Sequence, residues 1–550
     1  MKRYAIGIDY GTLSARALLL DIDTGEEVAV TVFEYPHKVM ESELPCGKPL
    51  GQGWALQHPQ DYLDALHNTI IDLLDKTKID NACVLGVGVD FTSCTMIPVD
   101  NSNTPLCMKP EFESEPHAYV KLWKHHAAQN YADLIDRLAK ERGEKFIGLY
   151  GGKTNSEYLL PKALEILKEA PHVYAACDRL VEAADWIVWQ LTGNRVRSTC
   201  AAGYKSFWNY KTGYPSRNFL AALDPAFENS AEEKLAGQLM NVGQCAGYIT
   251  HEMARFTGLR EGTAVSVAVV DAHASLPACK ITEPGKLLMI LGTSSCHIVL
   301  DREEKAIPGV CGTVKDAIIP GFFAYEAGQS CVGDSFEWFV NQCVPQSYYQ
   351  EAKEKNCSIH KLLRSKAKPL HPGESGLLAM DWWNGVRSTL MNFNLSGMIL
   401  GLTLHTKPEE IYRAMIESTA YGTRKIIETY RKGGVKIHEL YAAGGIASKD
   451  SMMMQIYADV CNMTIHLSGS SQSGALGSAI YAVSAAGEEK SGYHDLVEIV
   501  QKLGKLQNTT YVPSRKNVEI YDTLYREYDR LYNYFGNGEN QVMETLKDLK

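Results

Sequence analysis

The chain opens with two short, mostly apolar runs on either side of a polar turn. An apolar run at residues 4–8 ends at Asp9 and Gly11, and the second run follows directly. Two such runs around a turn that contains glycine predict a β-hairpin. The same plan returns at residues 287–301, with Gly292 at the turn. We therefore expect two hairpins of one kind, far apart in the chain.

Strand-like and helix-like patterns alternate along the rest of the sequence. Residues 61–76 place apolar side chains at helical spacing, whereas 84–90 and 265–270 are nearly continuous apolar runs that predict buried strands. A further strand at 439–443 leads into a helical stretch. This alternation predicts the α/β class. Near the end, residues 518–535 form one apolar helical face made mainly of tyrosines, which is expected to dock onto the protein.

Two motifs are interpreted as structural. Gly86 and Gly88 are not a dinucleotide-binding fingerprint, because the turn that follows them does not open a helix. His125 and His126 are adjacent, and neighbours on a helix point about 100° apart. A solvated helix start is therefore preferred to a shared metal ion.

Composition limits the class of protein. At 550 residues the chain exceeds what one hydrophobic core usually serves, so two large domains are expected. The apolar share of 45% and the charged share of 22% are those of a soluble globular protein. A formal net charge of −10 argues against a nucleic acid or an anionic membrane as partner. A phosphorylated ligand would therefore have to bind through local backbone dipoles and a cation.

Targeting and cysteine patterns predict a cytoplasmic protein. No apolar run approaches the ~20 residues that span a bilayer, and no cleavage site of a signal peptide follows the N-terminus. The 14 cysteines include no Cys-x-x-Cys pair, so neither a zinc site nor a disulfide framework is indicated. We expect reduced, mostly buried thiols.

The two predicted turns carry the groups of a phosphate site. Gly11 permits positive φ and a close approach to a ligand, and the hydroxyls of Thr12 and Thr293 can donate to phosphate oxygens. Asp9 offers a carboxylate for Mg²⁺, which prefers oxygen ligands. An ordinary hairpin turn explains either copy alone. The second copy, at Gly292, favours a polyphosphate held between two similar halves.

Three further positions suggest chemistry, each with a plainer alternative. Asp271 stands between a predicted strand and a helix start, as either a helix cap or a general base in a cleft. Lys205 lies among aromatic and small residues, where it either extends to water or holds a sugar oxygen. Gly444 and Gly445 precede a helix, as either an ordinary loop or a seat for a nucleotide.

Taken together these motifs resemble the FGGY family of carbohydrate kinases over nearly the whole chain. Residues 156–162 resemble one family signature, and 397–402 followed by 410–417 resemble the other. Asp450 departs from the family, which usually has Asn there, and this leaves the adenosine contacts open. The likeness is greatest to bacterial members that phosphorylate L-ribulose, and it is carried by residues 109–112, 122–124, 202–206, 223–225, 292–296, 326–330 and 381–385.

The resemblance implies a fold and a division into domains. The fold is α/β, with two ribonuclease-H-like domains of the actin and hexokinase type and a cleft between them. We expect an N-terminal domain at 1–277, which holds the sugar and the first phosphate turn, and a nucleotide-binding C-terminal domain at 278–490. Residues 491–550 are expected to form a helical extension packed on the second domain.

The resemblance also implies an activity. This is ATP-dependent phosphorylation of L-ribulose at O5 in arabinose breakdown, with Asp271 as general base and Mg²⁺ held near Asp9. The expected sugar contacts are Ser93, Lys205, Asp271 and Glu326. The expected ATP contacts are Gly11, Thr12, Gly292, Thr293, Ser294, Gly333, Gly444 and Gly445.

Several alternatives remain. D-ribulose, L-xylulose and ribitol are rival substrates that the sequence does not rank against L-ribulose, because such isomers differ in where one hydroxyl points. A non-catalytic ATP-driven binding protein of the actin or chaperone branch is disfavoured, because it would need neither Asp271 nor Lys205. The small-molecule sugar is the expected partner, and a homodimer is one option for the oligomeric state.

Overall fold

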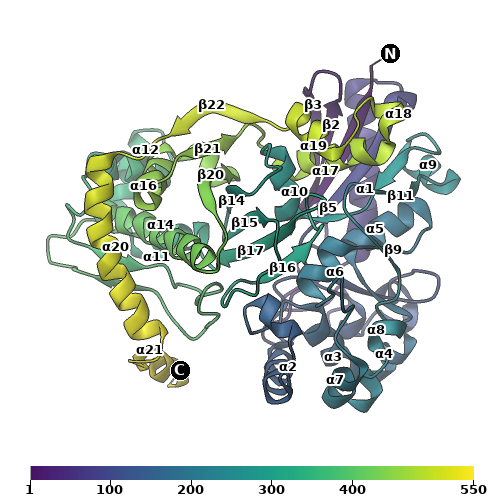
Figure 1. The fold of residues 1–550 in the computed structure, drawn as a ribbon, viewed down its shortest axis with the longest axis horizontal. Helices are drawn as coiled ribbons and strands as arrows, with labels where there is room; N and C mark the ends of the chain where they lie inside the picture. The colour runs from purple at the N-terminus through teal and green to yellow at the C-terminus, as the bar shows by residue number, and fades with distance from the viewer. Residues whose placement is uncertain (1, 550) are drawn as a thin grey trace.

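The structure, a computed structural model, describes residues 2–549 and is built around two seven-stranded sheets (Figure 1). The first sheet contains β1 (Tyr4–Tyr10), β2 (Ser14–Asp21), β3 (Glu27–Glu34), β5 (Val84–Phe91), β11 (Cys245–Tyr248), β12 (Ala264–Ser266) and β13 (Val269–Val270). The second contains β14 (Gly285–Leu291), β15 (Ser295–Asp301), β16 (Gly312–Lys315), β17 (Phe323–Gln329), β20 (Ile437–Ala443), β21 (Ile465–Ser468) and β22 (Leu506–Tyr511).

The two sheets repeat one topology. In the first, β3, β2, β1, β5 and β12 lie side by side, with two antiparallel pairs followed by two parallel pairs. In the second, β17, β15, β14, β20 and β21 repeat that order and those directions. Both predicted hairpins are therefore present, as β1–β2 and β14–β15. The predicted α/β fold with two ribonuclease-H-like domains is confirmed.

Helices cover both faces of the first sheet. Helix α1 (Pro59–Thr77) packs on one face and confirms the helix predicted at 61–76. Helix α17 (Ser473–Ala486) packs on the other face, against β1 and β5. A Cβ atom at Gly7 or Gly88 would lie 1.8 or 1.9 Å from a carbonyl oxygen of α17. These glycines thus let a helix backbone approach the strands closely, and Gly88 is structural, as expected.

Two helices lie between the sheets. Helix α10 (Asp271–Ala278) packs against α17, and both contribute to an apolar cluster that includes Leu18 of the first sheet and Leu288 of the second. Helix α19 (Leu496–Leu503) packs on α17 in the same cluster. Helices late in the sequence therefore contact the first sheet, and the domain boundaries at residues 277 and 490 stay a prediction.

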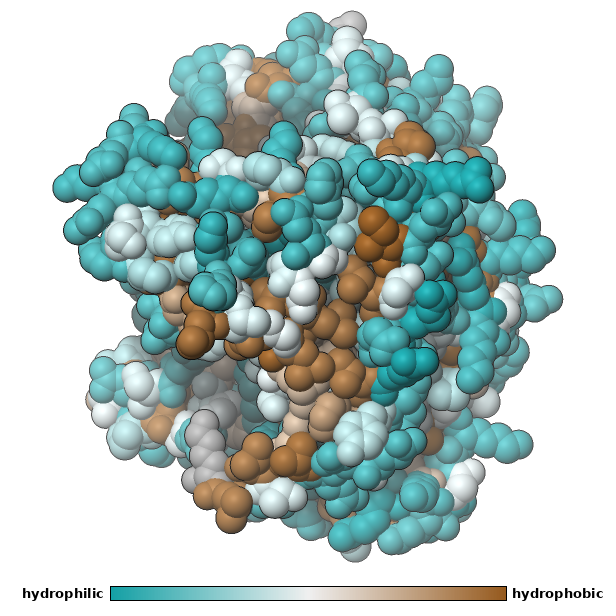
Figure 2. Space-filling model, turned by 90° about the vertical axis from the view of Figure 1, so that its left-hand side faces the viewer, coloured by the Kyte–Doolittle hydropathy of each residue, from teal (hydrophilic) through white to brown (hydrophobic). Residues whose placement is uncertain are grey.

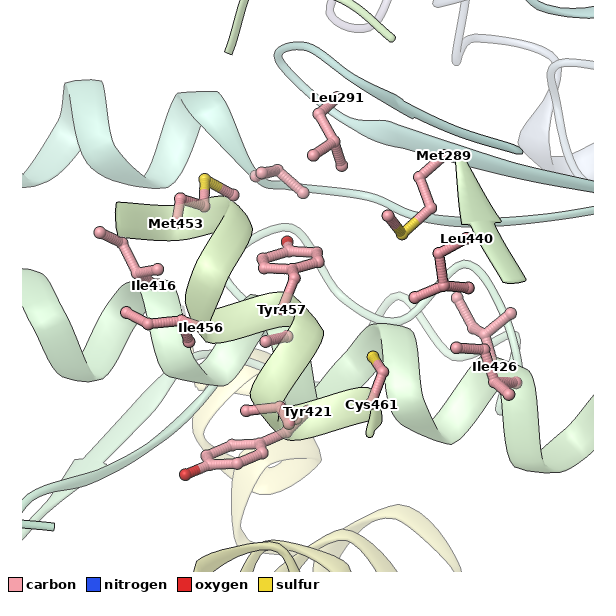
Figure 3. Close-up of a cluster of buried hydrophobic side chains, with 14 of the residues drawn as sticks. Met289, Leu291, Ile416, Tyr421, Ile426, Leu440, Met453, Ile456, Tyr457 and Cys461 are labelled. Atoms are coloured by element: carbon pink, nitrogen blue, oxygen red, sulfur yellow. The ribbon is translucent and has the colours of Figure 1, made fainter. Parts of the chain in front are cut away.

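The far face of the second sheet is covered by α14 (Pro408–Lys432), α16 (Ser451–Cys461) and α20 (Arg515–Gly536). Side chains of β14 and β20, among them Met289 and Leu440, lie on the same side of α16 as Tyr457, and Ile456 faces Ile416 of α14 (Figure 3). Alternate residues of β14 face opposite sides, and both sides are covered, which explains why the strand reads as a continuous apolar run. The tyrosine face of 518–535 is buried as predicted, through Tyr521, Tyr525, Tyr528 and Tyr532.

We call the first sheet and the elements attached to it the first lobe, and the second sheet and its helices the second lobe. A smaller, four-stranded sheet extends the first lobe. It contains β4 (Leu56–Gln57), β6 (Met96–Val99), β7 (Val120–Lys121) and β8 (Arg179–Glu182), and α2 (Gln129–Arg142) and α3 (Leu159–Glu169) accompany it. The solvated helix start predicted around His125 is wrong. His125 is fully buried in a turn after β7, and its Nε2 lies 3.1 Å from the Glu165 carboxylate on α3.

The other helices and strands connect these layers. They are α4 (Pro171–Ala176), α5 (Ala183–Thr192), α6 (Thr199–Lys205), α7 (Arg217–Leu223), α8 (Ser230–Glu233), α9 (His251–Thr257), α11 (Gly333–Cys343), α12 (Gln346–Glu354), α13 (Ile359–Ala367), α15 (Gly445–Lys449), α18 (Glu488–Ser491), α21 (Val542–Asp548), β9 (Val196–Ser198), β10 (Gln238–Met240), β18 (Leu378–Met380) and β19 (Met398–Leu400). Among the described helices, none has the length and apolar character needed to cross a bilayer.

Candidate active site

A cavity of about 470 Å³ lies where the two hairpin turns meet α10 and the start of α17. Both lobes line it, because Thr12 belongs to the first hairpin and Thr293 to the second. Of the residues predicted from sequence, the following line this cavity: Asp9, Thr12, Ser93, Lys205, Asp271, Gly292, Thr293, Ser294, Glu326 and Gly444. Folding thus brings together groups that lie up to several hundred residues apart.

The first turn presents a hydroxyl to the cavity. The turn closes through the Gly11 N–H, which donates to Ser14 O at 3.0 Å. Trp123 Nε1 donates to Thr12 Oγ1 at 3.1 Å. Because an indole nitrogen only donates, Thr12 must accept in this bond, and its own hydroxyl hydrogen is free to donate to a ligand.

Gly11 differs from its expected role. Its φ is not in the left-handed region, and it does not line the cavity. A Cβ at this position would lie 3.2 Å from Ser14 O, so glycine relieves crowding inside the turn rather than supplying positive φ.

The second turn is supported from behind by α11. Gly292 N–H donates to Ser294 O at 2.9 Å, and Gly333 N–H donates to Gly292 O at 3.0 Å. A Cβ at Gly333 would lie 2.7 Å from Gly292 O, which accounts for glycine at the start of α11. Gly333 therefore holds the turn in place and does not itself line the cavity.

The predicted glycine pair lies beside the same turn. Gly444 has a φ of 97°, and a Cβ there would meet Leu291 O at 2.5 Å, so only glycine fits. Gly445 begins the short helix α15, does not line the cavity, and has no atom within 4 Å of a built Cβ. At the family departure, the Asp450 side chain accepts the Met453 N–H at 3.0 Å and caps α16, which Asn could also do. Its carboxylate also lies 3.3 Å from Arg364, an ion pair that Asn could not form.

Two carboxyls, of which Asp9 is half-buried and Asp90 fully buried, lie next to each other below the first turn. Asp9 and Asp90 are cross-strand neighbours on β1 and β5, and Asp90 Oδ2 accepts a 2.6 Å hydrogen bond from Ser478. Burial raises the pKa of Asp9, and burial together with the Asp9 charge raises the pKa of Asp90 well above its usual range. Arg16 faces the same cavity and is the cross-strand partner of Asp9.

This pair fits Mg²⁺ in its chemistry. Asp9 lines the cavity, and Asp90 Oδ1 is buried without a hydrogen-bond partner in the described part of the protein. Mg²⁺ is usually held by one or two carboxylates, waters and substrate phosphates. No cluster of three or more His, Cys, Asp or Glu side chains suited to a metal occurs within residues 2–549, so phosphate oxygens and waters would have to complete the shell.

Asp271 lies at the first position of α10, directly after β13. Its Oδ1 accepts the Ala272 N–H at 2.7 Å, and the side chain lines the cavity. Burial raises the pKa of Asp271 to about 7, and the Asp9 charge adds to this rise, whereas Lys205 opposes it. A carboxyl with this pKa can accept a proton near neutral pH.

Two cations, Lys205 and Arg387, and the ring of His273 surround Glu326 in the centre of β17. Arg387 donates to Glu326 Oε1 at 2.7 Å, Lys205 Nζ lies 3.8 Å from the same oxygen, and His273 Nε2 lies 3.2 Å from Oε2. Burial alone would raise the pKa of Glu326, but Lys205, His273 and Arg387 outweigh it and hold the pKa below the usual range. Glu326 is therefore an ionised hydrogen-bond acceptor at the cavity wall.

Lys205 and Ser93 are both available to a polar ligand. Lys205 is buried at the end of α6, with its ammonium 5.1 Å from the centre of the Tyr158 ring, so it does not extend to water. Ser93 Oγ is buried without a partner in the described residues. An unpartnered buried hydroxyl is costly, which suits a position that a ligand hydroxyl fills.

Sequence reasoning did not select several cavity residues as site residues. They are Arg16, Asp90 (behind the lining), Trp123, Glu157 and Arg387. Arg16 could have been found from the hairpin register, which places it opposite Asp9. Arg387 stands in an irregular segment, and no local pattern marks it.

Comparison with known proteins defines the class. The N-terminal domain of the FGGY family of carbohydrate kinases matches residues 4–277, and the C-terminal domain of that family matches residues 287–486. The chain belongs to the FGGY family of carbohydrate kinases.

Individual relatives are similar over the full length. A ribulokinase of Bacillus licheniformis is 55% identical over 539 residues, which cover 98% of each chain. A ribulokinase of Geobacillus thermodenitrificans is 52% identical over 551 residues, covering 100% of this chain and 97% of the relative. The crystal structure of a gluconate kinase from Lactobacillus acidophilus has a TM-score of 0.79 at 20% identity and covers 98% of this chain and 99% of its own. This last likeness concerns the fold.

Proposed function

We propose that the protein is an ATP-dependent kinase that phosphorylates L-ribulose at O5 to give L-ribulose 5-phosphate. The observation that carries the proposal is the meeting of two threonine turns and Asp271 in one cavity. Full-length relatives named ribulokinase support L-ribulose as the sugar. D-ribulose, L-xylulose and ribitol are the rival acceptors within the same chemistry.

Phosphoryl transfer needs alignment and charge neutralisation more than covalent chemistry. In the proposal, the turns at Thr12 and Thr293 hold the β- and γ-phosphates from opposite lobes. Ser294 and Gly444 border the same phosphates, and Gly11, Gly333 and Gly445 support the turns and the nucleotide from behind. Mg²⁺ held by Asp9, with Asp90 next to it, would neutralise phosphate charge.

The sugar lies on the other side of Asp271. Ser93, Lys205 and Glu326 offer a donor or acceptor each to its hydroxyl and carbonyl oxygens. Asp271 accepts the proton of the attacking hydroxyl as the new O–P bond forms. With a pKa of about 7, this carboxyl is deprotonated in about half of the molecules at neutral pH, and general-base assistance of this kind is worth ~10²–10⁴ in rate.

A coupled assay over a panel of pentuloses and pentitols tests the substrate. ATP consumption should depend on added sugar and should be fastest with L-ribulose. ATP turnover that is equally fast without sugar would overturn the kinase proposal, and a higher kcat/KM with another acceptor would overturn the choice of L-ribulose.

Substitution Asp271→Asn tests the base. The amide keeps the shape of the side chain but cannot accept the proton, so kcat is expected to fall by ~10²–10⁴ while the KM for ATP stays close to that of the parent. Asp301→Asn, at the far end of β15, is the matched control and should leave kcat within about threefold. Turnover of the Asp271 variant within about tenfold of the parent would contradict the assignment.

We also propose a homodimer, through the face that carries α20 (Figures 1 and 2). Apolar side chains gather in the middle of this face. Leu400, Leu402 and Leu404 are exposed at alternate positions in and after β19, which belongs to a two-stranded sheet. Exposed apolar side chains of this kind can pack against the same side chains of a second copy. Sedimentation velocity should show a dimer for the parent and a monomer for the double variant Leu402→Asp and Leu404→Asp. A monomeric parent would refute the proposed homodimer.

A further inference from the structure

Two turns of the first lobe form the wall of the cavity assigned above to the sugar. One, between β5 and β6, contains Ser93, and the other, after β7, contains Trp123. A cross-strand pair between Met96 of β6 and Lys121 of β7 brings the two turns close to each other. Their spacing decides how Ser93 and the Trp123 ring are placed relative to a ligand.

Lys162 of α3 joins these two turns. Its ammonium donates to Cys94 O and to Leu122 O, each at 2.8 Å. Cys94 follows Ser93 directly, and Leu122 precedes Trp123 directly. Lys162 is fully buried and does not line the cavity, so it acts on a ligand only through the two turns.

The environment of Lys162 supports a specific role. No carboxylate lies within 4 Å of its ammonium in the described part of the chain, and burial lowers its pKa. A buried cation without a close counter-ion is destabilising unless hydrogen bonds compensate. The two hydrogen bonds to Cys94 O and Leu122 O are therefore the contacts that compensate for burying the Lys162 ammonium. Cys94 itself has a φ of 51°, in the left-handed region that non-glycine residues rarely adopt, so its turn needs support.

The next turn of α3 holds the same segment at two more points. Glu165, three residues after Lys162 and on the same helix face, pairs with Lys121 at 2.9 Å and with His125 at 3.1 Å. Glu165, Lys121 and His125 are all fully buried. One face of α3 therefore fixes residues 121–125 on both sides of Trp123.

We propose that Lys162 is a positioning residue of the sugar site, which sets the distance between Ser93 and Trp123 by holding Cys94 O and Leu122 O on one ammonium. This inference rests on the proposed function, because it assigns the wall formed by these turns to the sugar. It gives the lysine at the end of the 156–162 signature a physical role.

Variants Lys162→Met and Lys162→Gln test the proposal by steady-state kinetics. Misplacement of a binding group by about 1 Å can cost ~10²-fold, so the KM for the sugar is expected to rise about tenfold or more in Lys162→Met. The KM for ATP should rise less than the KM for the sugar, because Lys162 reaches the first phosphate turn only indirectly, through the hydrogen bond from Trp123 to Thr12. Lys162→Gln, which keeps one donor, should show a smaller rise.

Arg197→Met is the matched control. Arg197 is also a buried cation of the first lobe that donates to backbone carbonyls, Leu180 O at 2.6 Å and Lys234 O at 3.3 Å, but it does not line the cavity or touch its turns. The variant Arg197→Met should lower the thermal midpoint as Lys162→Met does. Its KM values for the sugar and for ATP should both stay within about twofold of the parent. An unchanged sugar KM in Lys162→Met, or an equal rise in both KM values, would overturn the inference.

Hydrogen exchange of the free protein separates this inference from the proposed function. In Lys162→Gln, residues 92–95 and 122–126 should exchange faster than in the parent, and the Arg197 control should leave them unchanged. Unchanged exchange in both segments would refute the role of Lys162 even if the parent is an L-ribulose kinase. A parent without sugar-dependent ATP consumption would refute the proposed function, and the exchange result would still decide whether Lys162 fixes the turns.

Discussion

At the scale of single residues, the cavity contains acidic groups that differ in ionisation. Glu326 is held ionised by Lys205, His273 and Arg387, whereas burial and the Asp9 charge raise the pKa of Asp271 to about 7. One carboxylate can therefore accept hydrogen bonds permanently, while the other can take up and release a proton. Pairs of titratable groups whose environments separate their pKa values are typical of acid and base chemistry.

The pH dependence of turnover follows from Asp271. A base must be deprotonated to act, so kcat/KM at low concentrations of both substrates is expected to fall about tenfold per pH unit below about pH 7. Lys205 lowers the pKa of Asp271, so Lys205→Met should move the acidic limb of the kcat/KM profile to higher pH and should also reduce activity. Lys211→Met, at an exposed ion pair with Glu304, should leave the limb in place. A limb that stays or moves to lower pH in the Lys205 variant would contradict the assignment.

At the scale of elements, α17 is the helix on which the first turn depends. It lies against β1 and β5, and its first residues line the cavity beside Asp9. The contact is possible because Gly7 and Gly88 present no side chain to the helix. Correct placement of the first hairpin turn therefore depends on glycines that do not line the cavity.

Gly88→Ala is expected to destabilise the protein through this contact. The new Cβ would lie 1.9 Å from Ser478 O in the helix backbone, and overpacking of this kind costs about 1–3 kcal/mol or more. Gly148→Ala is the control, because its Cβ would meet its nearest neighbour at 3.8 Å. Thermal unfolding should show a clear loss for Gly88→Ala and little change for Gly148→Ala. Equal midpoints for the two variants would show that α17 can move aside without cost.

At the scale of the whole molecule, the two lobes face one cavity through unlike groups. The first lobe supplies Ser93 and Lys205, and the second supplies Glu326 and Arg387. A sugar that contacts both lobes would hold them together, and closure would exclude water, which could otherwise attack ATP.

Small-angle scattering tests this closure. The radius of gyration is expected to fall when L-ribulose and a non-hydrolysable ATP analogue are both bound, and to fall less with the analogue alone. The variant Glu326→Gln, which loses a predicted sugar contact on the second lobe, should contract less at the same ligand concentrations. An identical radius with and without ligands would count against closure.

The sequence predicted much of this molecule from local patterns. Apolar spacing is enough to predict the hairpins, the helix near residues 61–76 and the tyrosine face of α20, because each depends on residues that are close in sequence. The same reasoning was wrong for His125, because Glu165 of a different helix buries it. Arg387 could not be predicted, since its importance comes from Glu326, a residue far from it in sequence.

The sequence by itself determined the α/β class, the two matching hairpins and ten of the residues that line the cavity, because glycine and threonine recur at both turns and the family resemblance supplied the sugar contacts. Only the tertiary structure decided that Thr12 and Thr293 face one cavity, that Asp9 lies beside Asp90, and that Lys205, Arg387 and His273 surround Glu326. Distances across a cavity depend on how sheets and helices pack, and packing between segments hundreds of residues apart leaves no local pattern in the chain.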